Sequence, residues 1–143
     1  SHLVCELLWT TGLRAKEVNA IMDNTETDMR CSVSILLENG AFCSISMVGD
    51  SKIRRRIHNA YFGSKATLFV DGLPFKVTVK KPEEEPQTTI EDEMPKVPEP
   101  MDNFIGSILK RTEPLASGVD GLKVVEVIEA AYESARTGKT VAL

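Results

Sequence analysis

The stretch that decides the fold is residues 117–143, SGVDGLKVVEVIEAAYESARTGKTVAL. Ser117 is followed three residues later by Asp120, a spacing typical of a capping box at the start of a helix. Near the other end, Gly138 follows the basic residue Arg136, which predicts a left-handed glycine stop after a basic last turn. We therefore expect one long helix between these two signals.

The expected helix is apolar around more than half of its circumference. Its charged residues recur every three or four positions and so form one narrow stripe, Lys123, Glu126, Glu129, Glu133 and Arg136. Apolar side chains fill the rest, namely Leu122, Val124, Val125, Val127, Ile128, Ala131, Tyr132 and Ala135. Such a helix must lie between layers or pack on a sheet. The middle of the chain should supply that sheet.

Residues 29–48 form the clearest hairpin in the sequence. A two-residue Asn39-Gly40 turn would set Ser34 beside Ile45, whereas a three-residue turn with Gly40 left-handed pairs Ser34 with Ser44. Only the second register collects the apolar residues on one face, Cys31, Val33, Ile35, Leu37, Ala41, Cys43, Ile45 and Met47. Because a slip of one residue would move a whole strand's pattern to the wrong face, we expect the three-residue turn.

The opposite face of this hairpin is rich in small hydroxyls. It carries Ser32, Ser34, Leu36, Phe42, Ser44 and Ser46. Two interpretations stay open, a solvated face or a face that meets another chain or a ligand. Solvated strands usually carry charges rather than serines, so we expect this face to form the interface of a homo-oligomer, at its simplest a dimer.

The remaining elements complete an α+β chain. We expect helices at residues 3–11 and 102–112, further strands at 16–23, 53–61, 66–70 and 75–80, and a short terminal strand at 140–143. This predicts a mostly antiparallel, open-faced sheet of about five or six strands with helices packed on one face. Residues 1–143 are treated as one domain.

Residues 82–100, PEEEPQTTIEDEMPKVPEP, differ in composition from the rest. They contain five prolines, and residues 83–102 hold eight acidic side chains against Lys96 alone. Residues 83–102 therefore carry a charge of about −7, and since the formal net charge is −4 the rest of the chain carries about +3. We expect a flexible acidic loop or lid here. A bulk-charge argument for nucleic-acid binding fails.

Composition excludes several classes of protein. The three cysteines, Cys5, Cys31 and Cys43, are odd in number and lack C-x-x-C spacing, so we interpret them as reduced core residues of a cytoplasmic protein. No apolar run approaches the roughly 20 residues of a membrane span, and no secretory signal is present. Two histidines are too few for a metal site. In the basic run 52–56, strand alternation separates Arg55 from Arg54 and Arg56, so we expect no nucleic-acid partner.

No internal catalytic motif is present, but several strings resemble a known family. They are SHLVCELLWTTG at the start, ENGAFCSISM and YFGSKATLFVDG in the middle, and NFIGSIL followed by EPLASGVDGLKVVEVIEAAYESARTGKTVAL at the end. Together they resemble the C-terminal domain of the Gfo/Idh/MocA oxidoreductases, the glucose–fructose oxidoreductase and inositol dehydrogenase types. The resemblance covers nearly the whole chain, and its final thirty residues are the most specific part.

The resemblance implies a function. Members join a Rossmann domain that holds NAD or NADP to a C-terminal α/β domain that uses its open sheet for substrate and oligomer contacts. This chain matches the second part only. We therefore expect the substrate-binding domain of an oxidoreductase acting on a sugar, polyol or similar hydroxyl substrate, with NAD or NADP in the full-length parent and no cofactor in the isolated, inert chain. Alternatives are a self-standing interaction domain that uses the serine-rich face, or a ligand-binding regulatory domain.

The resemblance also implies site residues. The family's D-x-x-x-H pair supplies an acid and a base, and of that pair only the histidine could remain here, as His2. A native His2 would act as a general base, the role that histidine most often takes in proton transfer. The other interpretation is that Ser1-His2 is a cloning remnant or a frayed terminus. The family's corresponding strand region implies Arg54, Arg56 and Tyr61 as substrate contacts.

Overall fold

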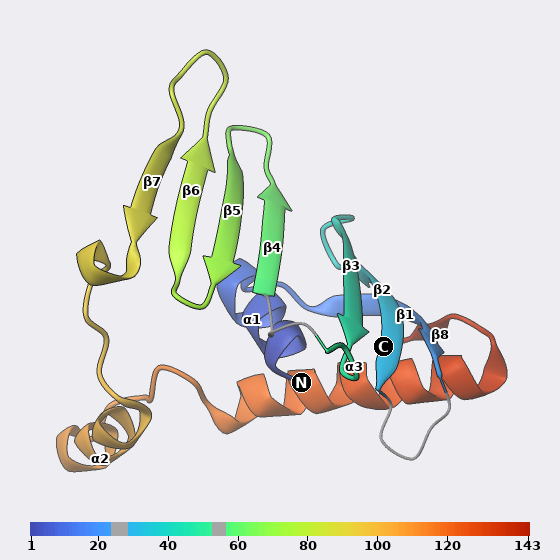
Figure 1. Cartoon of the computed structure of the whole chain (residues 1–143). Coiled ribbons are helices and arrows are strands. Elements are labelled where there is room, and N and C mark those ends of the chain that lie inside the picture. The colour runs from blue at the N-terminus through green and yellow to red at the C-terminus, as the bar shows by residue number, and fades with distance from the viewer. Residues whose placement is uncertain (24–28, 53–56) are drawn as a thin grey trace. The chain divides into compact units, whose positions relative to one another are not determined.

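The structure, a computed structural model, describes residues 1–23, 29–52 and 57–143. The chain divides into two compact units, residues 1–50 with 100–143 and residues 51–99, whereas the sequence analysis treats it as one domain. The α+β class is confirmed. The expected single sheet of five or six strands is, among the described residues, two antiparallel sheets of four strands each. Figure 1 shows the elements along the chain.

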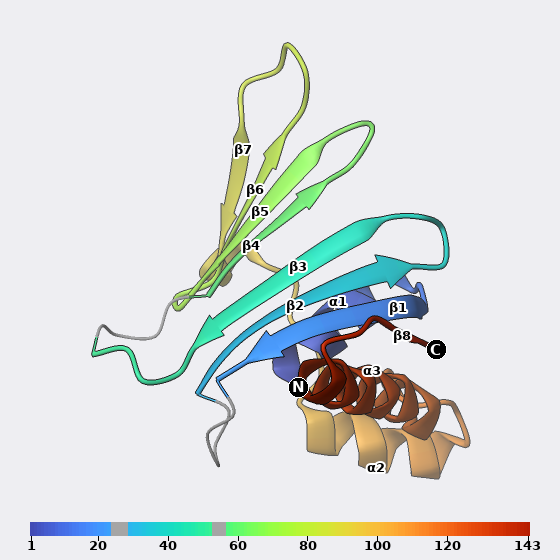
Figure 2. The ribbon, with the colours of Figure 1, turned by 90° about the vertical axis from the view of Figure 1, so that its right-hand side faces the viewer.

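The first unit is a sheet with the long helix on one face. Its strands are β1 (Ala15–Met22), β2 (Arg30–Leu37), β3 (Phe42–Val48) and β8 (Val141–Ala142), in the order β3-β2-β1-β8. Its helices are α1 (His2–Thr11), α2 (Pro100–Lys110) and α3 (Gly118–Thr137). Figure 2 shows α3 running under the sheet formed by β1, β2 and β3.

The core of this unit lies between α3, α1 and the inner face of the sheet. The sheet contributes Val18, Ala20, Val33, Ile35 and Leu37, α3 contributes Val124, Val127, Ala130, Ala131 and Ser134, and α1 contributes Leu7 and Leu8. Val18 and Val127 are almost completely buried. Full burial of one such side chain stabilises a fold by about 1.5–3 kcal/mol. Strand alternation and the buried stripe of α3 therefore hold this layer together.

The predicted ends of α3 are confirmed. The Ser117 side chain accepts a hydrogen bond from the amide of Asp120, and the Asp120 carboxylate accepts one from the amide of Ser117. At the other end Gly138 has φ 69°, the left-handed conformation that glycine adopts without a steric cost. The expectation that this helix packs on a sheet is confirmed, since α3 lies against β1. Its outer side is not covered among the described residues, and Leu122, Val125 and Tyr132 are about half exposed.

The three-residue turn of the β2–β3 hairpin is confirmed as well. Ser34 lies opposite Ser44, and Gly40 is left-handed with φ 86°. The interpretation of all three cysteines as core residues is wrong for Cys5, which is exposed, and Cys31 and Cys43 are only half-buried. None of the three forms a disulfide. Burial raises the pKa of the Cys43 thiol.

The second unit is a four-stranded antiparallel sheet, and its described residues contain no α-helix of their own. Its strands are β4 (Ile57–Phe62), β5 (Thr67–Gly72), β6 (Lys76–Lys80) and β7 (Gln87–Ile90), paired in that order, with a short 3-10 turn at Glu91–Glu93. Among its described residues none is buried. Strand β7 corrects the sequence analysis, since part of the expected 82–100 loop pairs with β6. The strand was missed because prolines and acidic residues flank its four residues on both sides.

Candidate functional site

His2 is the first residue of α1 and is exposed. Ser1 precedes it as the N-cap residue, without a side-chain hydrogen bond to the helix. The imidazole is therefore accessible to a ligand. Whether it acts as a base stays a prediction.

The three expected substrate contacts are only partly described. Arg54 and Arg56 lie outside the described residues. Tyr61 lies in β4, half-buried, on the same side of the strand as Ile57 and Asn59. Tyr61 belongs to the second unit and His2 to the first.

The hydroxyl-rich residues of β2 and β3 form one continuous surface of the first unit. We call it the serine face, and it consists of Ser32, Ser34, Leu36, Phe42, Ser44 and Ser46. Ser32 lies opposite Ser46, Ser34 opposite Ser44, and Leu36 opposite Phe42. Phe42 is 72% exposed. The register thus gives two serine pairs and one apolar pair on the side of the sheet away from α3.

Strand β1 adds a third row to this surface, which sequence reasoning missed. Glu17 pairs with Leu36, Asn19 with Ser34, and Ile21, 73% exposed, with Ser32. Glu17 is the one charged side chain in the nine positions of these three rows. In the sequence, Glu17, Asn19 and Ile21 alternate with the apolar residues Val18 and Ala20, and this alternation indicates that they lie on the face away from the core. The β1–β2 register was still needed to place them beside the serines.

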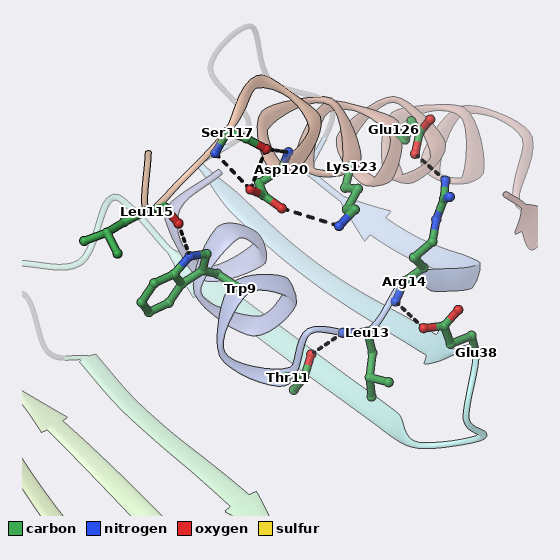
Figure 3. A network of polar contacts seen from close by, with 10 residues as sticks. All are labelled: Trp9, Thr11, Leu13, Arg14, Glu38, Leu115, Ser117, Asp120, Lys123 and Glu126. Carbon is green, nitrogen blue, oxygen red and sulfur yellow. Dashed lines mark hydrogen bonds and ion pairs between the residues drawn. The ribbon is translucent and has the colours of Figure 1, made fainter. Parts of the chain in front are cut away.

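A polar network holds α1 and the start of α3 in place (Figure 3). The indole Nε1 of Trp9 donates to the carbonyl oxygen of Leu115 at 3.1 Å, and the Asn103 side chain accepts from the Leu115 amide at 3.0 Å. The Ser117 amide and hydroxyl hold the pKa of the Asp120 carboxyl below its usual value, with a smaller contribution from Lys123. This network positions the helices and is not itself a reactive arrangement.

The second unit contains a titratable cluster on one face of its sheet. Nδ1 of His58 lies 2.6 Å from Oδ1 of Asp71, and Nζ of Lys76 lies 3.7 Å from Oδ2 of the same carboxylate. His58 stacks on Phe69 with ring centroids 6.3 Å apart. The hydrogen bond to His58 lowers the pKa of Asp71, helped by Lys76. His58 lies in the strand expected at 53–61 and Asp71 between the strands expected at 66–70 and 75–80, so only the strand register brings the two together.

The described residues contain no group of three or more His, Cys, Asp and Glu side chains that could hold a metal ion. Within the same ranges, no helix is long and apolar enough to cross a membrane. The described strands also do not form the cradle by which a Rossmann domain holds a dinucleotide. A Rossmann cradle needs parallel strands joined through a helix, and every strand pair described here is antiparallel.

Comparison with known proteins identifies the fold. Residues 14–143 match the model of the oxidoreductase family, C-terminal alpha/beta domain, of the Gfo/Idh/MocA type. The chain belongs to the Gfo/Idh/MocA oxidoreductase family. A comparison with curated proteins found no match.

Solved structures share this fold at low sequence identity. The Gfo/Idh/MocA domain is similar to aldose-aldose oxidoreductase from Caulobacter crescentus (TM-score 0.82, 22% identity, 99% of this chain and 45% of that one). It is also similar to a putative oxidoreductase from Thermotoga maritima, with a TM-score of 0.85 and 17% identity over 99% of this chain and 45% of that one. A third similar structure is the WlbA dehydrogenase from Chromobacterium violaceum, solved with NADH and UDP-GlcNAcA. Its TM-score is 0.78, with 25% identity over 99% of this chain and 44% of that one. The domain thus spans less than half the length of these structures.

Proposed function

We propose that this chain is the substrate-binding and oligomerisation domain of an NAD(P)-dependent oxidoreductase that acts on a hydroxyl group of a sugar, polyol or similar compound. The observation that carries the proposal is the family match over residues 14–143. Structural neighbours that are an aldose oxidoreductase and a dehydrogenase solved with NADH and a nucleotide sugar support the substrate class and the cofactor.

In this proposal the nicotinamide cofactor is held outside the present chain and supplies the hydride chemistry. The contribution of this chain is a base and a binding surface. His2 lies exposed at the start of α1, where its imidazole is free to take the proton of a substrate hydroxyl. Without the nucleotide-binding part, the chain alone is inert. The proposal includes a cytoplasmic location, which the absence of disulfides among three cysteines supports.

The test uses the protein expressed from its full reading frame. Oxidation of a panel of aldoses and polyols is followed by the absorbance of reduced nicotinamide, with NAD and NADP in separate arms. We expect turnover with at least one sugar, and a large loss of kcat in His2→Gln. The matched control is His58→Gln, which removes the other histidine of the chain. Equal losses in both variants would remove His2 from the mechanism, and a reading frame without a dinucleotide-binding segment would overturn the proposal.

The second candidate function is a non-catalytic interaction domain. It is favoured by the serine face, an exposed strand surface with almost no charge. Self-association of the chain without turnover of any sugar in the full protein would select this candidate. Self-association together with turnover fits the first proposal, in which the same face forms a homo-oligomer.

A further inference from the structure

The first unit contains a cavity that neither His2 nor the serine face uses. It has a volume of about 340 Å³ and is lined by Arg14, Ala15, Lys16, Glu38, Lys123, Glu126, Val127 and Leu143. These residues come from the start of β1, the β2–β3 turn, α3 and the end of the chain. Pockets for small molecules in proteins are commonly about 300–1,000 Å³, so this cavity is large enough for a small metabolite.

Two cations, Arg14 and Lys16, line the cavity beside a bulge at the start of β1. Ala15 pairs with Leu37 and Glu17 with Leu36, so Lys16 is an extra residue between two paired ones. Bulges change the direction in which a side chain points and are frequent beside binding sites. Alternation counted from the buried Val18 places Lys16 toward α3, and it joins Arg14 as part of the cavity wall.

Backbone hydrogen bonds fix both cationic residues. The Arg14 amide donates to Oε1 of Glu38 at 3.2 Å, and the Arg14 carbonyl oxygen accepts from the Glu38 amide at 3.0 Å. The carbonyl oxygen of Lys16 accepts from the Leu143 amide at 2.9 Å. The main chain on either side of the bulge is therefore held in place. Only the two long side chains need to be ordered when a ligand binds.

The charges of the two side chains are poorly compensated. Among the residues that the structure describes, the guanidinium of Arg14 has one ion pair, with Glu126 at 3.7 Å, and its side chain is 61% exposed (Figure 3). Within the described part of the chain, Lys16 forms no ion pair. Since a guanidinium carries five N–H donors in a planar fork that matches carboxylates and phosphates, most of the binding capacity of Arg14 is unused.

We propose that this cavity binds a small organic anion through its carboxylate or phosphate group, held by Arg14 and Lys16. Lys123 lines the same cavity and adds positive charge, although its ammonium lies 3.4 Å from Asp120. Glu126 competes with the ligand for Arg14 and so limits the affinity. The proposal is independent of the proposed oxidoreductase function, because the site contains neither His2 nor any residue of the serine face.

The test is a titration of the ¹⁵N-labelled protein followed by amide chemical shifts. Inorganic phosphate and succinate are added in separate arms, and sodium chloride at equal ionic strength corrects for screening. We expect saturable shifts at Arg14, Lys16, Glu38 and Glu126. A response to phosphate alone or to succinate alone supports the site and identifies the anionic group. Shifts that only follow ionic strength in both arms would overturn the proposal.

Variants separate a binding role from a structural one. Arg14→Gln and Lys16→Gln should each weaken binding roughly tenfold, the effect of losing a charge-assisted hydrogen bond. Lys139→Gln is the matched control, because Lys139 is an exposed cation of the same unit that does not line the cavity. Glu126→Gln should tighten binding, since it removes the competing carboxylate. Weaker binding in Glu126→Gln, or equal losses in Lys139→Gln and Arg14→Gln, would contradict the site.

Discussion

The hydroxyl of Ser134, on α3, accepts a hydrogen bond from the backbone amide of Ala20, on β1, at 3.0 Å, and Ser134 is completely buried. Strand β8 pairs only with Glu17 and Val18, so Ala20 lies beyond its end. The helix therefore supplies the acceptor that the short strand does not reach. This contact joins the long helix to the second-last strand of the sheet through a polar group inside the core.

Ser134→Ala should lower the free energy of unfolding by about 1–3 kcal/mol, because it leaves a buried amide without an acceptor. Urea unfolding followed by circular dichroism measures the change. Ser64→Ala, in an exposed turn of the second unit, is the control and should stay within about 0.5 kcal/mol of the parent. Equal stability of Ser134→Ala and the parent would show that water replaces the hydroxyl.

The capping box at the start of α3 should make stability depend on acid pH. Ser117→Ala removes the N-cap side chain, which typically costs about 1 kcal/mol. The pKa of Asp120 is lowered in the folded state, so its contribution is present above the unfolded pKa of about 3.9 and is lost as pH falls through the folded pKa. The difference in urea midpoint between the parent and Asp120→Asn should thus be present at neutral pH and shrink in acid. If this difference in urea midpoint were the same at every pH, the charge of Asp120 would not contribute to the stability of the helix cap.

The carboxyl of Asp71 should titrate below the usual range of aspartate. Its hydrogen bond to His58 is the largest cause, and Lys76 contributes less. His58→Gln should therefore raise the pKa of Asp71 further than Lys76→Gln does. Carbon-detected NMR of the side-chain carboxyl measures both values. A larger effect from Lys76→Gln would reverse the order of the two interactions.

Positive charge on the serine face should prevent self-association. If Ser34 and Ser44 lie in a dimer interface, Lys at both positions places ammonium groups directly opposite one another across the strand pair and at the contact. The molar mass from light scattering should fall from dimer to monomer. Ser64→Lys, in an exposed turn of the other unit, is the control and should leave the mass unchanged. A mass unaffected by the double substitution would remove this face from the interface.

A glutamate-specific protease should cut the acidic segment first. Glu83, Glu84 and Glu85 are exposed outside any helix or strand, and every residue of the edge strand β7 is exposed. Glutamates of α3, among them Glu129 and Glu133, serve as internal controls in a helix packed on the sheet. Mass spectrometry of early fragments should find cuts after 83–85 before cuts within 118–137. Simultaneous cutting at both places would show that the acidic segment is as well packed as α3.

Elements with local signals could be predicted from the sequence. Both ends of α3 followed from Ser117, Asp120 and Gly138, because capping needs only residues a few positions apart. The β2–β3 register followed from the turn and from two apolar patterns that agree in only one alignment. The family resemblance, which rests on short strings along the chain, is confirmed over residues 14–143.

Long-range pairings could not be predicted in the same way. The bulge at Lys16 and the third row that β1 adds to the serine face depend on the register of β1 with β2, which are joined by more than a short turn. The contact between His58 and Asp71 depends on the register of β4 with β5, which was not assigned from the sequence. Strand β7 was missed because its four residues have no buried face and so no apolar alternation. The division into two sheets was missed because an apolar pattern identifies a strand but does not identify the strands that lie beside it in the sheet.

By itself the sequence determined the helices, the caps of α3, the β2–β3 hairpin and the family, since these depend on residues close together in the chain. Only the tertiary structure decided which side chains meet, among them Ser134 with Ala20 and Arg14 with Glu126. Such contacts join residues more than 100 positions apart, and their geometry follows from how a helix packs on a sheet. The periodicity of the sequence does not indicate which of these distant residues meet, and the contacts form only when α3 packs on the sheet.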